Sequence, residues 1–220
     1  IALPSTVANR SPWGGRLNRG YIQSWNFIVE RKLPSQFITT FGYVGTQTVH
    51  ALADRNINAA APGRGNSGRP LNATLGRAVD TNMWDGFLNA NYHALQVSFN
   101  RQFSGGFQMK GAYTFSKAIN ATDEDGWASV GWNYPDVMHR NRALAGYDRT
   151  HILQAAFIFE PPFGPGKAFL QDGFVSQILR NWQLSSIFSS YTGTPFTVSA
   201  SGASLNAPGN SQTADQVKPE

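Results

Sequence analysis

The residues best suited to chemistry lie between the regular stretches of the sequence. His139, Asp148 and His151, with several arginines nearby, have the side-chain types of a metal or catalytic site. No G-x-S-x-G, H-E-x-x-H or phosphate-binding loop accompanies them. We therefore interpret Asp148 as an ion-pair partner of Arg149 or of an arginine on a neighbouring strand. We expect no catalytic residue and no cofactor, and hence no enzyme.

A second group is acidic. Asp123 and Asp125 flank Glu124 in the segment N-A-T-D-E-D-G, and carboxylate oxygens are the ligands that Ca²⁺ prefers. The segment departs from an EF-hand loop, which needs acidic or Asn residues at alternate positions, glycine at the sixth position and glutamate at the twelfth. A solvated acidic loop is the simpler interpretation, and Asp123 and Asp125 remain weak candidates for a calcium site.

A third group is aromatic. Trp127, Trp132 and Tyr134 lie close together in one irregular segment. Flat aromatic rings can stack on a sugar or another flat ligand, or they can pack a loop against itself. The sequence favours neither interpretation, so these three residues are candidate ligand-binding residues.

The elements that must position these groups are strands. From Leu95 to Lys117, apolar and polar residues alternate on either side of the turn Ser104-Gly105-Gly106. The same pattern predicts about six long strands in an all-β, antiparallel up-and-down meander. They cover residues 21–31, 37–46, 92–103, 107–117, 151–160 and 182–191.

The connections between these strands alternate between short and long. Long external loops are predicted at 50–90 and 119–150, and a flexible tail at 199–220. In a meander, alternate connections lie at opposite ends of the sheet. Outer-membrane barrels have this asymmetry, with short periplasmic turns and long external loops, and their tilted strands need about 9–11 residues.

Alternation alone does not say which solvent the apolar face meets. Lys110 falls among the polar residues, and Arg101 falls close to a turn, so no charge is predicted at mid-membrane, where it would cost about 2–4 kcal/mol. Aromatic residues gather toward both strand ends, as interfacial girdles require. We therefore predict a segment of a large transmembrane β-barrel. The predicted lipid-facing residues are Phe99, Phe107, Met109, Tyr113, Phe115 and Phe157. The alternative is a soluble all-β carbohydrate-binding or adhesion module.

Composition is compatible with this prediction. Charged residues make up only 14 % of the chain, against 41 % apolar residues, and there is no cysteine. The net charge of +5 comes from scattered Lys and Arg residues, which do not point to nucleic acid as a partner.

Several motifs follow one another along the chain. They are N-Y-x-A-L-Q at 91–96, Y-T-x-S-K at 113–117, and the segments 140–151, 161–167, 181–188 and 192–198. In this order they resemble the barrel of Oar-like TonB-dependent receptors, of the type abundant in Acidobacteria. The resemblance implies a partial segment of an outer-membrane receptor with about 22 strands and a plug domain. It also implies membrane lipid, the plug domain of the parent chain, the TonB system and an unknown imported ligand as partners. Export or surface adhesion is the alternative role within the family.

Overall fold

The fold is built on one antiparallel sheet, whose strands follow one another in space as they do in the chain. The computed structural model describes residues 17–124, 129–215 and 217. The sheet has seven strands in the order β1-β2-β3-β4-β6-β7, with the short β5 paired to β4. Their bounds are β1 (Tyr21–Lys32), β2 (Phe37–Asn56), β3 (Asn82–Ser104), β4 (Phe107–Asn120), β5 (Ala143–Leu144), β6 (His151–Phe159) and β7 (Leu184–Tyr191). The predicted meander is confirmed.

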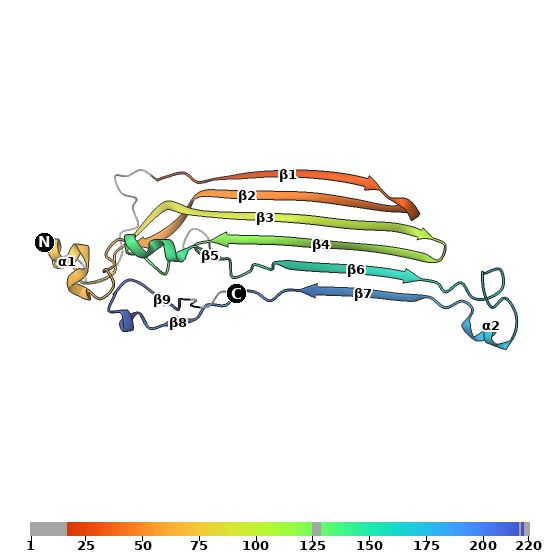
Figure 1. The fold of residues 1–220 in the computed structure, drawn as a ribbon. Coiled ribbons are helices and arrows are strands. Elements are labelled where there is room, and N and C mark those ends of the chain that lie inside the picture. The colour runs from red at the N-terminus through yellow and green to blue at the C-terminus, as the bar shows by residue number, and fades with distance from the viewer. Residues whose placement is uncertain (1–16, 125–128, 216, 218–220) are drawn as a thin grey trace.

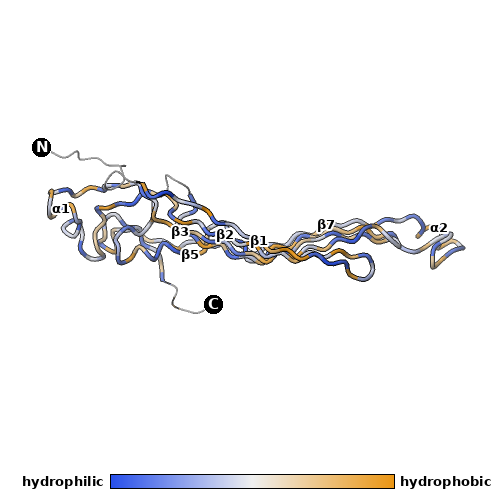
Figure 2. Tube along the Cα trace, turned by 90° about the horizontal axis from the view of Figure 1, so that it is seen from above, coloured by the Kyte–Doolittle hydropathy of each residue, from blue (hydrophilic) through white to orange (hydrophobic). Residues whose placement is uncertain are grey.

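The sheet is a single layer. Figure 1 shows the strands side by side along the long axis of the molecule, and Figure 2 shows the same sheet edge-on as a thin, twisted ribbon. Within the described residues, β1 pairs only with β2 and β7 pairs only with β6, so both outer edges of the sheet lack a strand partner. The buried core is small and lies at the long-loop end, where Ala53, Leu88 and Val130 pack together.

The other end of the sheet carries the tighter connections. The turn between β1 and β2 contains the short 3-10 helix η2 (Pro34–Gln36), which begins with a proline. Between β3 and β4, Gly105 and Gly106 have φ values of 59° and 81°, a left-handed conformation that glycine adopts without steric cost. A longer connection with the helix α2 (Phe174–Leu179) joins β6 to β7 at this same end (Figure 1).

Strands β2 and β3 are longer than the sequence pattern indicates. They continue to Asn56 and begin at Asn82, so that part of the predicted loop 50–90 is a strand pair. Two register shifts interrupt the pairing, one between Thr48 and Ala51 and one between Ala51 and Leu52. Each bulge puts consecutive side chains out of alternation, which removes the sequence signal beyond this point.

The long-loop end is a folded cluster of short elements. The β2–β3 connection contains η3 (Asn66–Gly68) and α1 (Pro70–Leu75), and the β4–β6 connection contains η4 (Pro135–Asn141). The segment after β7 forms β8 (Ser199–Ala200), η5 (Gly202–Leu205) and β9 (Gln212–Thr213). Within the described part of the chain, no helix has the length and apolar character needed to span a membrane.

Candidate functional site

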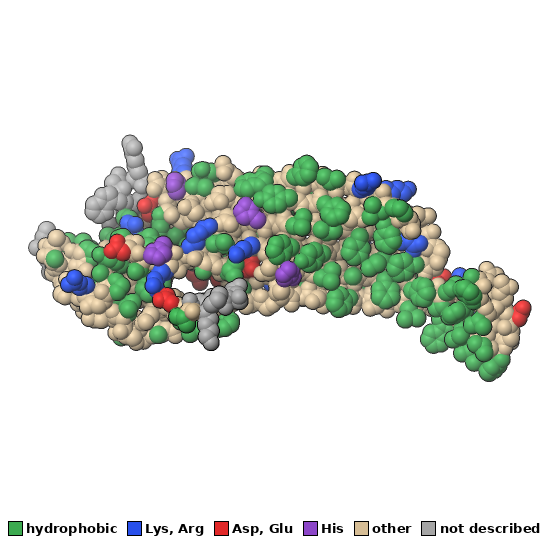
Figure 3. All heavy atoms as spheres, viewed as in Figure 1, with side chains coloured by type: hydrophobic (Ala, Val, Ile, Leu, Met, Phe, Trp, Pro, Cys, Tyr) green, Lys and Arg blue, Asp and Glu red, His purple; other side chains and the backbone are tan. Residues whose placement is uncertain are grey.

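One face of the sheet is a continuous apolar surface. In the cross-strand register, Tyr43 lies beside Leu95, Leu95 beside Phe115, and Phe115 beside His151. We call this surface the apolar band, made of Phe27, Val29, Phe41, Tyr43, Leu95, Val97, Phe99, Phe107, Met109, Tyr113, Phe115, Leu153, Phe157, Phe159, Leu184 and Phe188. Figure 3 shows hydrophobic side chains spread over this face, with charged side chains toward its two ends. All six predicted lipid-facing residues belong to the band.

The opposite face of the sheet carries small polar side chains, and we call it the polar face. Its members along the strands include Thr40, Ser98, Thr114, Gln154 and Ser189. Lys110 lies on this face between Asn100 and Ala156, as the sequence predicts. Ile158 and Ile187 also lie there, so the polar face has an apolar corner over β6 and β7.

Two aromatic rings on the apolar face of the sheet cover glycines on the next strand. Trp25 is directly opposite Gly45, and Phe99 is directly opposite Gly111. A methyl group added at Gly111 would lie 2.4 Å from Cζ of Phe99, and one added at Gly45 would lie 2.4 Å from the indole of Trp25. The rings therefore occupy the space that a larger residue would need.

Arg101 lies at the short-turn border of the apolar band. Its Nε donates to the Ser35 carbonyl at 2.8 Å and its Nη1 donates to the Phe107 carbonyl at 2.6 Å. The guanidinium lies over the rings of Phe37 and Phe107, at 5.9 Å and 5.2 Å from their centroids. The charged group thus reaches the turns and leaves the centre of the band apolar.

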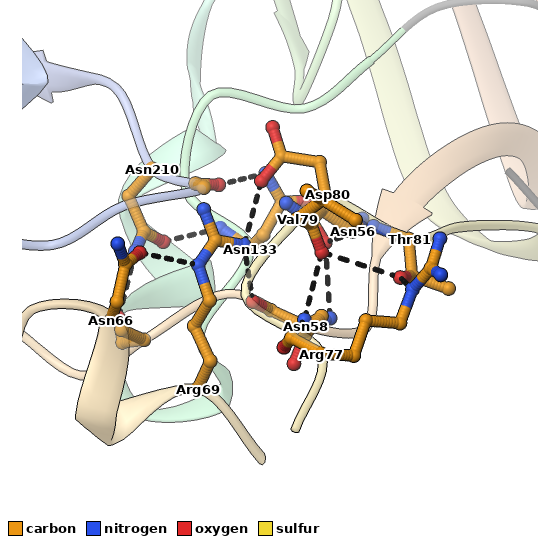
Figure 4. A network of polar contacts seen from close by, with 12 residues as sticks. Asn56, Asn58, Asn66, Arg69, Arg77, Val79, Asp80, Thr81, Asn133 and Asn210 are labelled. Carbon is orange, nitrogen blue, oxygen red and sulfur yellow. Dashed lines mark hydrogen bonds and ion pairs between the residues drawn. The ribbon is translucent and has the colours of Figure 1, made fainter. Parts of the chain in front are cut away.

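At the long-loop end, a chain of asparagines joins three connections. The backbone N–H of Asn56, the last residue of β2, donates to Oδ1 of Asn133 in the β4–β6 connection, and the N–H of Asn133 donates to Oδ1 of Asn210 in the segment after β7. Nδ2 of Asn210 donates to the Ala60 carbonyl at 2.9 Å, which closes the loop back onto the first connection. Figure 4 shows these side chains converging from separate segments. Asn56 and Asn133 are buried, so their hydrogen bonds fix the relative positions of the three segments.

Asn58 and Arg69 extend this network within the β2–β3 connection. Asn58 is fully buried, and its amide donates to the carbonyls of Arg77 and Val79 at 2.9 Å and 2.8 Å. Arg69 donates to the Asn58 carbonyl and forms an ion pair with Asp80 at 2.7 Å. The hydrogen bonds of Asn58 and Arg69 thus hold together the irregular part of the β2–β3 connection, which has no strand pairing of its own. The sequence carried no signal for this network, because asparagine is common in loops of every kind.

Of the three candidate ligand-binding aromatics, the structure describes Trp132 and Tyr134. Trp132 is only 3 % exposed, its Nε1 donates to Thr213, and Arg140 lies over its ring at 5.2 Å. It packs the loop against the tail and does not offer a free ring to a ligand. Tyr134 is half-buried, and Trp127 lies outside the described residues. For Trp132, the structure therefore agrees with the interpretation that the ring packs the loop, and not with stacking on a ligand.

The polar candidates have structural partners. Oδ1 of Asp123 accepts from the Gly146 N–H and from Nδ2 of Asn120, both at 2.9 Å, which holds two parts of the β4–β6 connection together. Asp125, the other calcium candidate, lies outside the described residues. Within the described ranges, no group of three His, Asp or Glu side chains gathers as metal ligands would.

Asp148 does not form the arginine ion pair that we expected. It is 4 % exposed, and its Oδ1 accepts from the Ala118 N–H of β4 at 2.6 Å while its Oδ2 accepts from the Thr150 hydroxyl. The pairing of β4 with β6 ends at Phe115 and His151, and beyond it the Asp148 carboxylate accepts the hydrogen bond that a backbone carbonyl of a paired strand would accept. His151 lies on the apolar face instead, hydrogen-bonded to Tyr113.

A groove opens between the extended β2–β3 pair and the β4–β6 connection. Its volume is about 540 Å³, and its lining includes Leu88, Asn89, Asp123 and Tyr147. A smaller hollow of about 190 Å³ continues along the strands past Thr46, Tyr92 and the same Tyr147. Thr46 and Tyr92 pair on the polar face, so the groove leads onto that face. Its size suits a small ligand or one end of a larger ligand.

The described strands have the properties of a barrel wall, with one apolar face, one polar face, and long connections gathered at one end. The family model for the outer membrane beta barrel domain matches residues 3–220, nearly the whole chain. The chain belongs to the outer membrane beta barrel domain family. Membership places this barrel segment in the outer membrane. Comparison with curated proteins and with solved structures gave no significant match.

Proposed function

We propose that this chain is a wall segment of a TonB-dependent outer-membrane receptor, whose long loops capture a ligand for import. The observation that carries the proposal is the folded loop cluster, in which Asn56, Asn133 and Asn210 hold three connections together beside a groove. Loops preorganised by buried hydrogen bonds lose less conformational freedom when a ligand binds. The proposed role is binding and transport, without catalysis.

The loop cluster lies over the polar face, where a ligand would enter. In the strand register, Ala51 pairs with Leu88, which shares a face with Ala90 and hence with Thr48. Ala51 and Leu88 pack with Val130 of the β4–β6 connection, and Ser129 forms a bridge with Asp54 of β2. The connection therefore crosses over the polar side of β3. A bound ligand would lie between this connection and the start of the lumen wall.

The apolar band is the surface that we assign to hydrocarbon. From Phe107 to Phe115 the strand advances by roughly 26 Å at about 3.3 Å per residue. A tilt of about 40° reduces this to roughly 20 Å along the membrane normal, close to the apolar height of about 25 Å in known barrels. A soluble module is not favoured, because in the described residues no second layer covers these rings.

The unpaired edges of β1 and β7 support a barrel larger than this sheet. In hydrocarbon, an unpaired backbone N–H or C=O group is costly, so membrane sheets close on themselves. The ordered motifs that resemble Oar-like receptors support a TonB-dependent receptor as this larger barrel. Such a receptor has a plug domain inside the barrel and TonB as its energy source.

The test uses the complete protein that contains this chain, folded in lipid nanodiscs, and the purified periplasmic domain of TonB. We expect saturable binding of the two by interferometry, and loss of binding when the N-terminal TonB-contacting segment of the parent protein is deleted. A properly folded barrel, shown by resistance to protease, that does not bind the TonB domain would refute the receptor assignment and leave the barrel assignment intact.

A further inference from the structure

The connection between β6 and β7 exposes a dense group of apolar side chains at the short-turn end of the sheet. They are Phe169, Leu170, Phe174, Val175, Ile178, Trp182 and Leu184, all more than 40 % exposed. Phe174 has the largest exposed fraction of the group, 77 %. Figure 3 shows these hydrophobic side chains projecting beyond the end of the strands. Such a patch on one loop indicates a contact surface, because isolated exposed apolar residues are common but contiguous groups are not.

The helix in this connection has two different faces. Phe174, Val175 and Ile178 recur at helical spacing and are exposed, and they share an arc with Leu179. Ser176 lies on the other side, where it is buried and donates to the Gln171 carbonyl, whereas Gln177 is exposed. The Ser176 side of α2 therefore faces its own loop, Gln177 forms an exposed polar edge, and the apolar side faces away from the protein.

The patch is continuous with the apolar band. Leu184, the first residue of β7, pairs with Phe159, which pairs with Phe107, and these three form the last row of the band. Trp182 precedes this row by two residues, and its indole N–H donates to the Ile178 carbonyl at 2.7 Å, which fixes the ring against the end of α2. Tryptophan with an apolar body and a satisfied polar tip is typical of a membrane interface.

The charged side chains of the connection balance one another. Lys167 forms an ion pair with Glu160 at 3.8 Å, and the exposed Asp172 lies two residues before the helix. Arg180 directly follows α2 and is exposed beside the apolar arc. A cationic side chain at this place matches the phosphates of a lipid leaflet, but the apolar arc, and not net charge, carries the proposal.

We propose that the β6–β7 connection lies in the periplasmic leaflet of the outer membrane, with the apolar side of α2 inserted among lipid acyl chains. The short-turn end of a barrel is its periplasmic end, and the segment would act there as a lateral anchor beside the wall. The proposal rests on the assignment of the apolar band to hydrocarbon, but does not depend on TonB or on ligand import.

These 220 residues contain no cysteine, so single-cysteine labelling of the complete protein requires only the replacement of any cysteine outside them. A nitroxide is attached at Phe174→Cys or Ile178→Cys, on the apolar side of α2, and at Gln177→Cys on its exposed polar edge. Phe157→Cys labels the apolar band. The protein is reconstituted into vesicles of phosphatidylethanolamine and phosphatidylglycerol, and collision rates with oxygen and with a water-soluble nickel chelate are measured by electron paramagnetic resonance.

Labels at positions 174 and 178 should resemble the label at 157, with frequent oxygen collisions and few nickel collisions, whereas the label at 177 should meet nickel. Nickel collisions at 174 and 178 equal to those at 177 would show that the segment hangs in water. Protection from both reagents would show that protein covers it. Either result overturns the proposal while the label at 157 still reports lipid; nickel access at 157 would instead refute the hydrocarbon assignment of the band.

Discussion

The phenolic oxygen of Tyr113 in β4 lies 2.7 Å from Nδ1 of His151 in β6. Tyr43 in β2 and His93 in β3 repeat this contact at 2.8 Å. In both pairs the histidine is displaced by two residues from the residue opposite the tyrosine, and the rings lie with centroids 6.1 Å and 6.2 Å apart. The two pairs mark the long-loop border of the apolar band, where the polar atom of each tyrosine has a histidine as its partner.

A double-mutant cycle tests this contact. Tyr113→Phe and His151→Gln each remove one partner, and we expect a coupling free energy of about 0.5–1.5 kcal/mol between them, the usual net value of one hydrogen bond. Urea unfolding of the complete protein in lipid vesicles provides the measurement. The control cycle combines Tyr113→Phe with His93→Gln, which should be additive; equal coupling in both cycles would show that the observed bond is not its source.

The ring of Phe99 over Gly111 predicts a size limit in the barrel wall. Gly111→Ala should destabilise the complete protein by about 1–3 kcal/mol, because the added methyl group collides with the ring and nearby backbone. Gly42→Ala is the matched control, since its nearest neighbour would be 3.7 Å away, an ordinary contact. Vesicle unfolding curves compare the two variants. Equal stability of both would mean that Phe99 moves aside freely.

The asparagine chain predicts that one side chain controls the order of distant loops. Asn133→Ala removes the amide that donates to the Val130 and Gly209 carbonyls and the oxygen that accepts from the Asn56 N–H; the bonds to Val130 and Asn56 are buried and the bond to Gly209 is partly buried. We expect hydrogen exchange to accelerate by tenfold or more at both 57–81 and 202–215, corresponding to about 1.4 kcal/mol or more of local stability. Mass spectrometry of the complete protein gives the rates.

Asn72→Ala provides the control for the loop experiment, because its amide donates only within its own connection, to the Asn66 carbonyl. Its effect should stay within residues 57–81. If Asn133→Ala left exchange in the tail unchanged, the three connections would not be coupled as described.

The buried carboxylate of Asp148 predicts a weak point where the chain re-enters the wall. Asp148→Ala leaves the Ala118 N–H without its acceptor, which should cost about 1–3 kcal/mol. Asp148→Asn keeps one acceptor oxygen and should cost less. Exchange protection of a peptide covering 107–120 would report both effects. The exposed Asp136 in the same connection serves as the control, and an equal loss of protection in Asp136→Ala would exclude a specific role for Asp148.

Side-chain alternation was sufficient to predict most of the sheet. The hairpin from Leu95 to Lys117 and its turn at Gly105-Gly106 follow directly from apolar periodicity and turn chemistry. The prediction failed at the two register shifts near Ala51, because a bulged strand no longer alternates and therefore resembles a loop in sequence. The ends of β2 and β3 were missed for that reason.

The candidate site was harder to predict than the wall. Asn56 meets Asn133 across 77 residues, and Asn133 meets Asn210 across another 77, so no local pattern relates them. Trp132 gave a plausible ligand-binding signal, but burial depends on the distant segment that contains Thr213. Asp148 was recognised as a paired carboxylate, whereas its partner is a backbone N–H, a group that every residue type except proline offers.

The two register shifts between Thr48 and Leu52 divide the β2–β3 pair into two parts. Residues 38–48 of β2 are paired on both sides, with β1 and β3, and a single insertion there would exchange outward and inward side chains along a whole strand. The two shifts offset each other, because the first adds a residue on β2 and the second adds a residue on β3, so pairing resumes at Leu52 and Gly86 in the register of the wall. Removal of one extra residue alone would therefore slide the loop-cluster end of the pair by one position against the wall, whereas removal of both would leave the two ends aligned.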